Sequence, residues 1–454
     1  MKRVSIVLLI CGLFALPSAA RADIAPPKNP PGSNLEPGAD VTQVRMAAET
    51  VLIDVKSDTT PDSLGSAVVT ADFTMRNLGT QDESLTVRFP IASNDGRGQF
   101  PELTGLAVKV NGKSVATRRV SYPEPVYMGQ DVPWAEFQVN FPAGQDVAIE
   151  VTYGLKGSGY APYTAFYYVL KTGAGWKGTI GSADITLRLP YEASAQNMAL
   201  GVETGWGSTT PGGVVEGNEV RWHFEDFEPG DSGPVGDMEF ALVAPSAWQA
   251  VLTERAHVSA TPNDGEAWGR LGKDYKAIFF LNKGYREDPD GQQLYQSAVE
   301  AYENCLRLLP KDAQWHAGFA DLLASRSYWD MSAYGATADT YRALEEMQTA
   351  LQIAPRDGKV QQIAEQISYM FPDAMVKNGA GYDFIWLTET PTPWPTLAPS
   401  ESTTPAAATR PPSQPATSTP ATAVPSSKPV SPACGSAALI PLAIGFWAAK
   451  KRKL

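Results

Sequence analysis

The stretch Ala-Val-Val-Thr-Ala-Asp-Phe-Thr-Met, residues 67–75, sets the fold class of the first half of the chain. It reads as an extended segment and continues an alternation that begins near Thr50. In that alternation Val51, Ile53 and Val55 are interleaved with Leu52, Asp54 and Lys56. Because a period of two places successive side chains on opposite faces of a strand, both segments are predicted to be β-strands.

Further segments of extended character follow at short intervals. They are 85–89, 106–110, 114–120, 135–141, 147–153, 164–170, 185–189, 220–224 and 239–243. Asn111-Gly112 between two of them is typical of a tight hairpin turn. Many short strands with turn residues and no helical period predict an all-β, β-sandwich-like domain over residues 48–246.

Three strand segments of this region carry a family resemblance: Phe73-Thr-Met-Arg-Asn77, Leu85-Thr-Val-Arg-Phe-Pro90 and residues 147–153. Through them, residues 48–245 resemble the all-β domains of unknown function found in bacterial envelope proteins. The resemblance implies a fold and no activity.

After Pro245 the periodicity becomes that of helices. One predicted helix presents a face of Trp268, Leu271, Gly272 and Tyr275, and a second one carries Ala298, Tyr302, Cys305 and Pro310. A looser copy has Phe319, Ala320 and Leu323 in its first helix and Ala343, Met347, Ala350 and Pro355 in its second. The spacing of apolar residues by three and four positions predicts amphipathic helices over residues 250–380.

These residues resemble the tetratricopeptide pattern W-x2-L-G-x2-Y, then A-x3-F, then P, over about 262–370. The resemblance implies paired helices stacked as repeats, with 360–370 as a capping helix. Tyr275 and Ala298 are 23 positions apart and Leu323 and Ala343 are 20 apart. The tetratricopeptide family has nine positions between the corresponding residues, so inserts are expected between the paired helices. The alternative is a set of αα-hairpins with small residues at the crossings.

In tetratricopeptide proteins the concave face of the first helices binds the ligand. Carried onto this chain, the resemblance implies a groove lined by Lys273, Lys276, Gln314, Asp321 and Ser325. Their mixed polarity predicts a protein or peptide partner.

The chain begins with features of a secretory signal. Lys2 and Arg3 precede an apolar run over residues 4–16, and Ala20-Arg-Ala22 matches an A-x-A cleavage site. Residues 1–22 are therefore predicted to be removed. Residues 23–47, whose first part holds five prolines and two glycines, are predicted to be a flexible lead-in.

The other end of the chain has three parts. Residues 388–432 are rich in Pro, Thr and Ser and predict an extended stalk, 433–449 carry no charge, and 450–454 are basic. This order resembles the C-terminal sorting and anchoring signals of bacterial surface proteins, although there is no LPxTG. Cys434 is the candidate for processing or lipidation, and the alternative is a retained transmembrane helix. Basic residues on the cytoplasmic side place the body outside the membrane.

The charge and the cysteine content of the chain argue against some classes of function and of fold. Removing the three basic residues of the signal and the four of the tail leaves 30 basic against 49 acidic residues, a formal charge near −19. Such a surface repels phosphate backbones and disfavours nucleic-acid binding. Cys305 and Cys434 remain after cleavage of the signal and lie at opposite ends of a predicted linker, so no disulfide framework is expected within a domain.

Motifs that suggest chemistry are incomplete. Gly230-Asp-Ser-Gly-Pro234 resembles the nucleophile loop of trypsin-like proteases but lacks a glycine, and His223 has no matching context. The histidines at 223, 257 and 316 form no metal-ligand pair, and the spacing of Asp226, Asp231 and Asp237 does not follow a calcium loop. We predict no catalytic residue, no metal and no cofactor.

The leading interpretation is a membrane-anchored extracytoplasmic binding or scaffold protein that is not an enzyme and contacts a protein or peptide through its helices. An alternative is a protein that binds cell-wall glycan by stacking sugars on the aromatic residues of the β-domain. Those aromatics are Trp134, Tyr160, Tyr163, Phe166, Tyr167, Tyr168, Trp176, Trp206 and Trp222. An envelope hydrolase is the third and weakest interpretation.

Overall fold

The computed structural model of the 454-residue chain places two long runs of regular structure in sequence, strands first and helices second. The residues that it describes are 36–37, 42–92, 102–124, 130–170, 173, 175–200, 208–229, 237–282, 289–334, 337–379 and 381–388. The predicted signal sequence, the predicted anchor segment and the basic tail, and all of the predicted stalk beyond Thr388, lie outside these residues.

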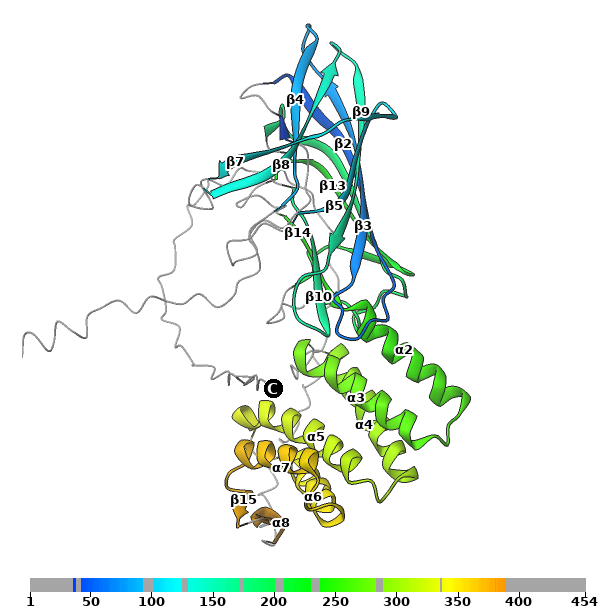
Figure 1. Ribbon diagram of the computed structural model, residues 1–454, viewed down its shortest axis with the longest axis vertical. Coiled ribbons are helices and arrows are strands. Elements are labelled where there is room, and N and C mark those ends of the chain that lie inside the picture. The colour runs from blue at the N-terminus through cyan, green and yellow to red at the C-terminus, as the bar shows by residue number, and fades with distance from the viewer. Residues whose placement is uncertain are drawn as a thin grey trace, which may run out of the picture. The chain divides into compact units, whose positions relative to one another are not determined.

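The largest element is a sheet of eight strands in the order β12-β13-β11-β2-β3-β9-β5-β6 (Figure 1). Neighbouring strands run antiparallel except β11 and β2, which are parallel. The strand bounds are β2 Val44–Val55, β3 Ser66–Asn77, β5 Thr104–Val110, β6 Lys113–Val115, β9 Asp146–Lys156, β11 Ile180–Arg188, β12 Val214–Glu216 and β13 Glu219–Phe227.

Two smaller sheets complete the strand region. One has the order β1-β4-β8-β7, and β10 pairs with β14 in the other. The bounds are β1 Glu36–Pro37, β4 Glu83–Pro90, β7 Arg118–Glu124, β8 Gln130–Phe141, β10 Tyr163–Tyr168 and β14 Met238–Val243.

Alternation in the sequence explains which face of the large sheet is buried. Along β3, every second residue from Ala67 to Met75 is at most 1% exposed, while the residues that alternate with them are half-buried or exposed. Successive side chains of a strand point to opposite faces, so an alternating sequence buries one face of β3 and exposes the other. In β2 the alternation shifts at a bulge between Met46 and Ala48, where the extra residue keeps both halves of the strand facing the core.

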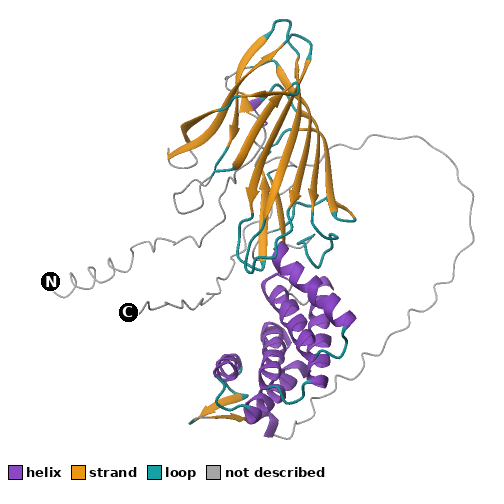
Figure 2. Cartoon of the chain, turned by 45° about the vertical axis from the view of Figure 1, so that its right-hand side comes forward, coloured by secondary structure: helices purple, strands orange, loops and turns teal. Residues whose placement is uncertain are grey.

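The second half of the described chain is helical (Figure 2). The bounds are α2 Pro245–Ala260, α3 Gly265–Asn282, α4 Pro289–Leu308, α5 Ala313–Tyr334, α6 Ala338–Ile353 and α7 Gly358–Met370, followed by β15 Met375–Asn378, β16 Gly381–Phe384 and α8 Ile385–Thr388. Helix α3 packs on α4, α5 packs on α6, and α7 lies against α5.

The fold class predicted from the sequence, a β-sandwich followed by tetratricopeptide repeats, is wrong. The strands are organised around one mixed sheet of eight, with a parallel pair inside it. Alternation shows which side of each strand is buried but not which strands pair, so it could not distinguish this sheet from a sandwich.

The helices do not form clear tetratricopeptide repeats either. Helices α3 and α4 have 18 and 20 residues, which together exceed a whole 34-residue repeat. Much of the sequence expected as an insert within the first pair is helix, since α3 runs to Asn282 and α4 begins at Pro289. The helix-forming residues of these stretches lengthen both helices beyond the repeat pattern.

The residues that match the repeat pattern do contribute to packing in the helical part. Leu271, Tyr275, Ala298, Tyr302, Ala343 and Ala350 are at most 5% exposed. A Cβ on Gly272 would lie 2.9 Å from the Tyr302 ring. Trp268 donates its indole hydrogen to the Pro262 carbonyl at 2.9 Å, and the carbonyls of Pro310 and Pro355 accept bonds from His316 and Gln361.

Strands and helices share one hydrophobic core. Helix α2 follows β14 with only Ala244 between them, and Pro245 occupies its first position, where no backbone donor is needed. The Tyr191 ring lies 6.2 Å from that of Trp248, and the Tyr163 hydroxyl donates to the Ile278 carbonyl. The buried apolar cluster runs from Val44 to Phe384, so residues 42–388 contain all of it.

None of the helices within the described residues is long and apolar enough to cross a membrane.

Candidate binding surface on helices α3, α5 and α7

Over residues 313–328 of helix α5, a row of residues reaches the solvent. Its members are Gln314, Gly318, Asp321, Ser325 and Tyr328, which are half-buried or exposed. They are spaced alternately by four and three positions, so they lie in one row along the helix. The residues between them are buried, apart from the half-buried Trp315, because α5 packs against α3, α4, α6 and α7.

Asp321 is the centre of a polar network that joins three helices. Its carboxylate forms an ion pair with Lys276 of α3 and accepts hydrogen bonds from Ser325 and from Gln366 of α7, each at 3.3 Å. The Lys276 ammonium also donates to the Gly318 carbonyl at 3.3 Å. The side chains of Lys276 and Asp321 are 16% and 15% exposed, so this pair is shielded better than an ordinary surface salt bridge.

A second polar contact joins the first turns of α5 and α7. The Gln314 amide donates to Asp357 at 2.9 Å, and the Lys359 ammonium donates to the Gln314 carbonyl at 3.5 Å. Asp357 also caps α7 by accepting from the backbone of Lys359 and Val360. The Val360 bond, followed by that from Gln314, lowers the pKa of Asp357.

The far end of the same row is aromatic. Tyr328 is 47% exposed, and its ring meets that of Phe371 edge-on at 6.2 Å. Tyr369 is 81% exposed and follows Gln366 by three positions, which places both on one side of α7. The contacts Gln314–Asp357, Asp321–Gln366 and Tyr328–Phe371 show that α5 and α7 run side by side in the same direction.

Together these residues define a surface that we call the α3–α5–α7 face: Lys273, Lys276, Gln314, Asp321, Ser325, Tyr328, Gln366 and Tyr369. Of the five residues proposed from the sequence, the structure brings Lys276, Asp321 and Ser325 into one network and places Gln314 in the neighbouring one. Lys273 is exposed at the border, one turn before Lys276.

Sequence reasoning missed Tyr328, Gln366 and Tyr369. Tyr328 lies seven positions after Asp321, which is the spacing of one helix face, and this signal could have found it. Nothing in the sequence marks Tyr369 as exposed, since tyrosine occurs both in cores and on surfaces.

Two glycines set the spacing of helix α3 from its neighbours. A Cβ on Gly269 would lie 2.5 Å from the Trp315 ring of α5, and one on Gly272 would lie 2.9 Å from the Tyr302 ring of α4. Both distances are shorter than carbon atoms tolerate. Glycine at these positions therefore lets Lys276, further along α3, reach Asp321 on α5.

A half-buried carboxyl borders the face. Burial and the charge of Glu254 raise the pKa of Asp274 to about 6, against the opposing effect of Lys273 and Arg270. Arg270 itself pairs with Glu254 through two hydrogen bonds of 2.7 and 3.1 Å.

The other residues noted in the sequence do not converge on a site. His223 lies between Asp184 and Glu225 on the exposed face of the large sheet, and His257 and His316 belong to α2 and α5. Within the described ranges, no three His, Cys, Asp or Glu side chains are placed to hold a metal ion. Trp206, Asp231, Ser232 and Cys434 lie outside the described residues.

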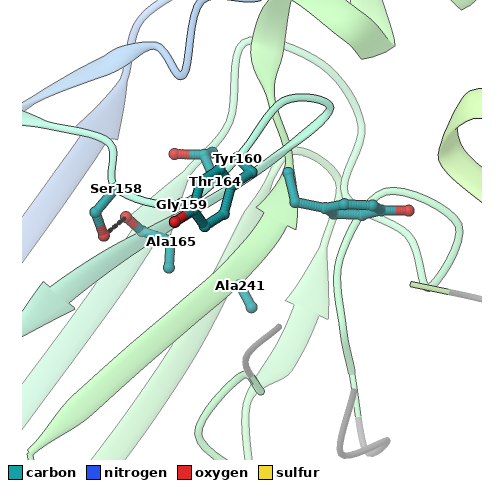
Figure 3. Close-up of a pocket in the computed structure, with 7 residues that line it drawn as sticks. Ser158, Gly159, Tyr160, Thr164, Ala165 and Ala241 are labelled. Carbon is teal, nitrogen blue, oxygen red and sulfur yellow. Dashed lines mark hydrogen bonds between the residues drawn. The ribbon is translucent and has the colours of Figure 1, made fainter. Parts of the chain in front are cut away.

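Most of the β-domain aromatics are core residues. Trp134, Tyr163, Phe166, Tyr168, Trp176 and Trp222 are at most 7% exposed, Tyr167 is half-buried, and Tyr160 is 53% exposed. Tyr160 lines a cavity of about 20 Å³ together with Ser158, Gly159, Tyr163, Thr164, Ala165 and Ala241 (Figure 3). Such a volume admits a water molecule but no sugar ring.

A buried charge cluster of the strand region, centred on Glu136, is satisfied internally. Glu136 is 4% exposed and accepts hydrogen bonds from Arg88 at 3.0 Å, Arg118 at 2.7 Å and the Tyr122 hydroxyl at 2.5 Å. Burial opposes its charge, but these three donors lower the pKa of Glu136 overall. The cluster ties β4, β7 and β8 together.

Comparison with known proteins does not assign the chain to a family. No family model matches the chain, and no curated protein matches it. Among solved structures, a Legionella pneumophila protein provisionally named as nutrient-binding has a TM-score of 0.38 at 18% identity, over 60% of this chain and 98% of that one.

Zinc peptidases of the M1 class also match. The enzyme from Deinococcus radiodurans has a TM-score of 0.22 at 9% identity, over 71% of this chain and 78% of that one. A two-domain M1 enzyme bound to L-arginine has a TM-score of 0.20 at 12% identity, over 40% of this chain and 39% of that one. Likeness at these TM-scores assigns neither a fold family nor an activity.

Proposed function

We propose that this protein is a binding protein that holds a partner protein or peptide on the α3–α5–α7 face. The observation that carries the proposal is the pair of exposed tyrosines, Tyr328 and Tyr369, beside a polar network that joins three helices. Tyrosine is enriched among the residues that dominate binding energy, because it combines a large ring with a polar end and loses little entropy.

The same proposal places the body outside a membrane. Its support is the sequence: a signal-like start, a Pro/Thr/Ser-rich stretch, an uncharged segment and a basic end. A tethered body with an exposed contact surface suits capture of a partner at the cell envelope.

The glycan alternative has lost most of its residues. Six of the nine aromatics on which it depended are core side chains, and a buried ring cannot stack on a sugar. Tyr328 and Tyr369 on the helices are exposed, so the helical part offers a more suitable binding surface than the β-domain aromatics do.

The test uses residues 42–388, which contain the whole core cluster. This chain and its Tyr369→Ala variant would be immobilised and exposed to envelope extract, and the retained proteins would be compared by quantitative mass spectrometry. We expect a defined set of proteins to be retained and at least tenfold less of that set on the variant, because an exposed ring at the centre of a contact carries much of its energy.

Tyr160→Ala is the matched control, since Tyr160 is also exposed but lies in the strand region. It should leave the retained set unchanged. Equal retention by the wild-type chain and Tyr369→Ala would remove the support for this face as the binding surface.

A further inference from the structure

Two Asn-Gly pairs of the chain lie at exposed hairpin turns. Asn111-Gly112 forms the turn between β5 and β6, and Asn378-Gly379 lies where β15 ends before the turn to β16. An asparagine followed by glycine is prone to spontaneous deamidation, because glycine has no side chain to keep its backbone nitrogen away from the asparagine carboxamide. Both pairs are exposed, so any difference between them must come from how each carboxamide is held.

The carboxamide of Asn111 is held by the large sheet. Its Oδ1 accepts a hydrogen bond of 2.9 Å from the backbone N–H of Ala148 on β9, and the Asn111 N–H donates to the Ala148 carbonyl at 2.8 Å. Asn111 and Gly112 have φ angles of 49° and 75°, which are typical of a type I′ turn. The Asn111 side chain can therefore approach the Gly112 nitrogen only after its bond to an inner strand of the sheet is broken.

The carboxamide of Asn378 is held by a side chain instead of by the backbone. Its Nδ2 donates to Asp383 Oδ2 at 2.9 Å, and Asp383 is itself exposed, so the two side chains can rotate without disturbing any strand. Strands β15 and β16 have four residues each and form a sheet of their own. An isolated two-stranded hairpin is only marginally stable, which leaves the Asn378 side chain freer than that of Asn111.

We propose that Asn378 is a site of spontaneous deamidation, whereas Asn111, in the same dipeptide, is protected by the sheet. In this reaction the Gly379 nitrogen attacks Cγ of Asn378 and forms a C–N bond. The carboxamide nitrogen leaves as ammonia, together with the proton of the Gly379 N–H. Water then opens the cyclic imide at either carbonyl and gives aspartate or isoaspartate, so water is the co-reactant that the two steps require.

The product weakens the β15–β16 hairpin. Loss of Nδ2 removes the donor to Asp383 and leaves a second negative charge beside it, and like charges on paired strands are unfavourable. Isoaspartate also adds a methylene group to the backbone next to the turn, which disturbs the pairing of Asn378 with Gly381.

The position of the hairpin gives this modification a structural consequence. Strand β15 packs on α7, where the Ser368 hydroxyl donates to the Met375 carbonyl at 2.8 Å, and α8 follows β16 directly (Figure 1). Helix α8 ends at Thr388, where the predicted stalk begins. Deamidation of Asn378 therefore loosens the part of the folded body that is next to the stalk.

The experiment incubates residues 42–388 at mildly alkaline pH and follows both sites by peptide mapping with mass spectrometry, using fragmentation that separates aspartate from isoaspartate. We expect Asn378 to deamidate about tenfold faster than Asn111, because the Asn111 side chain must first break a hydrogen bond to the sheet. Two synthetic peptides, 106–117 and 373–384, are the unfolded references. They should deamidate at similar rates, since nothing holds either carboxamide.

A second measurement tests the loosening of the hairpin. Asn378→Asp reproduces the aspartate product, and we expect the backbone amides of β15 and β16 to exchange their hydrogens faster in this variant than in the wild type. The matched variant Asn111→Asp should leave β15 and β16 unchanged. Unchanged exchange of β15 and β16 in Asn378→Asp would overturn the loosening.

The deamidation rates decide the rest of the inference. Equal rates at the two sites in the folded protein, or faster deamidation of Asn111, would overturn it. The same ratio of rates in the peptides as in the folded protein would also overturn it, because the local sequence and not the hydrogen bonds would then set the difference.

Discussion

At the scale of single residues, His316 is a nearly buried group of the helical part whose charge state depends on its hydrogen bonds. It is 9% exposed, its Nδ1 lies 2.5 Å from a Glu346 carboxylate oxygen, and its Nε2 lies 3.2 Å from the Pro310 carbonyl oxygen. Both partners are acceptors, so only the doubly protonated ring can donate to both. Burial opposes the charge, but these bonds and the nearby Asp312 outweigh it and raise the pKa of His316.

The raised pKa of His316 predicts that the free energy of unfolding falls as the pH rises. A group whose pKa is raised on folding contributes fully below its unfolded pKa, about 6.5 for histidine, and the contribution is lost as pH rises through the folded pKa. We therefore expect the free energy of unfolding of residues 42–388 to fall above about pH 6.5, and His316→Gln to flatten that fall. Urea denaturation at a series of pH values measures it.

The control is His223→Gln. The pKa of His223 is also raised, through hydrogen bonds to Asp184 and Glu225, but the three side chains are more than half exposed and solvent screens their interaction. The His223→Gln substitution should change the pH dependence of the free energy of unfolding less than His316→Gln does. An identical pH profile for wild type and His316→Gln would contradict the prediction.

The candidate site could be predicted only in part from the sequence. The repeat resemblance proposed Lys276, Asp321 and Ser325, and the structure joins these three side chains in one polar network. The resemblance missed Tyr328 and Tyr369, because whether a tyrosine lies in the core or on the surface depends on which helices pack against it. That information is in the tertiary structure and not in the local pattern.

At the scale of elements, the close approach of α3 to its neighbours predicts an unusual response to alanine. Replacing glycine by alanine inside a helix normally stabilises it by about 1 kcal/mol. At Gly269 the new Cβ would meet the Trp315 ring at 2.5 Å, so we expect Gly269→Ala to lower the free energy of unfolding by about 1–3 kcal/mol, the cost of overpacking. Urea denaturation of residues 42–388 gives the value.

Gly358→Ala provides the matched control. Gly358 is the first residue of α7, and a Cβ there would meet no atom within 4 Å. This variant should be as stable as the wild type or slightly more so. A Gly269→Ala variant that matched it would show that α3 and α5 can move apart without cost.

Element types followed from the sequence more readily than their arrangement did. Alternation at 51–55 and 67–75 corresponds to β2 and β3, and helical periodicity after Pro245 to α2 onward. The pairing of β2 with β11, which starts at Ile180, joins segments more than a hundred residues apart. Local patterns carry no information about such a pairing, and this is why the sandwich prediction failed.

At the scale of the whole molecule, the shared core predicts that strands and helices unfold together. Helix α2 contacts the strand region through the Trp248–Tyr191 rings and through a hydrogen bond of 2.9 Å from the Ser246 hydroxyl to the Ser63 carbonyl. Arg255 of α2 stacks on Trp248 and Tyr275 and donates to Gln196, which lies between β11 and β12 in the strand region. A boundary this tightly packed does not behave as a linker.

We therefore expect residues 42–388 to unfold in one calorimetric transition, and Trp248→Ala to lower its midpoint as a whole. Trp248 is 3% exposed, and truncating a buried tryptophan costs about 3–5 kcal/mol. Tyr369→Ala, at an exposed position, should leave the midpoint unchanged. Two separate transitions, with Trp248→Ala shifting only the helical one, would show instead that the strands and helices fold as independent domains.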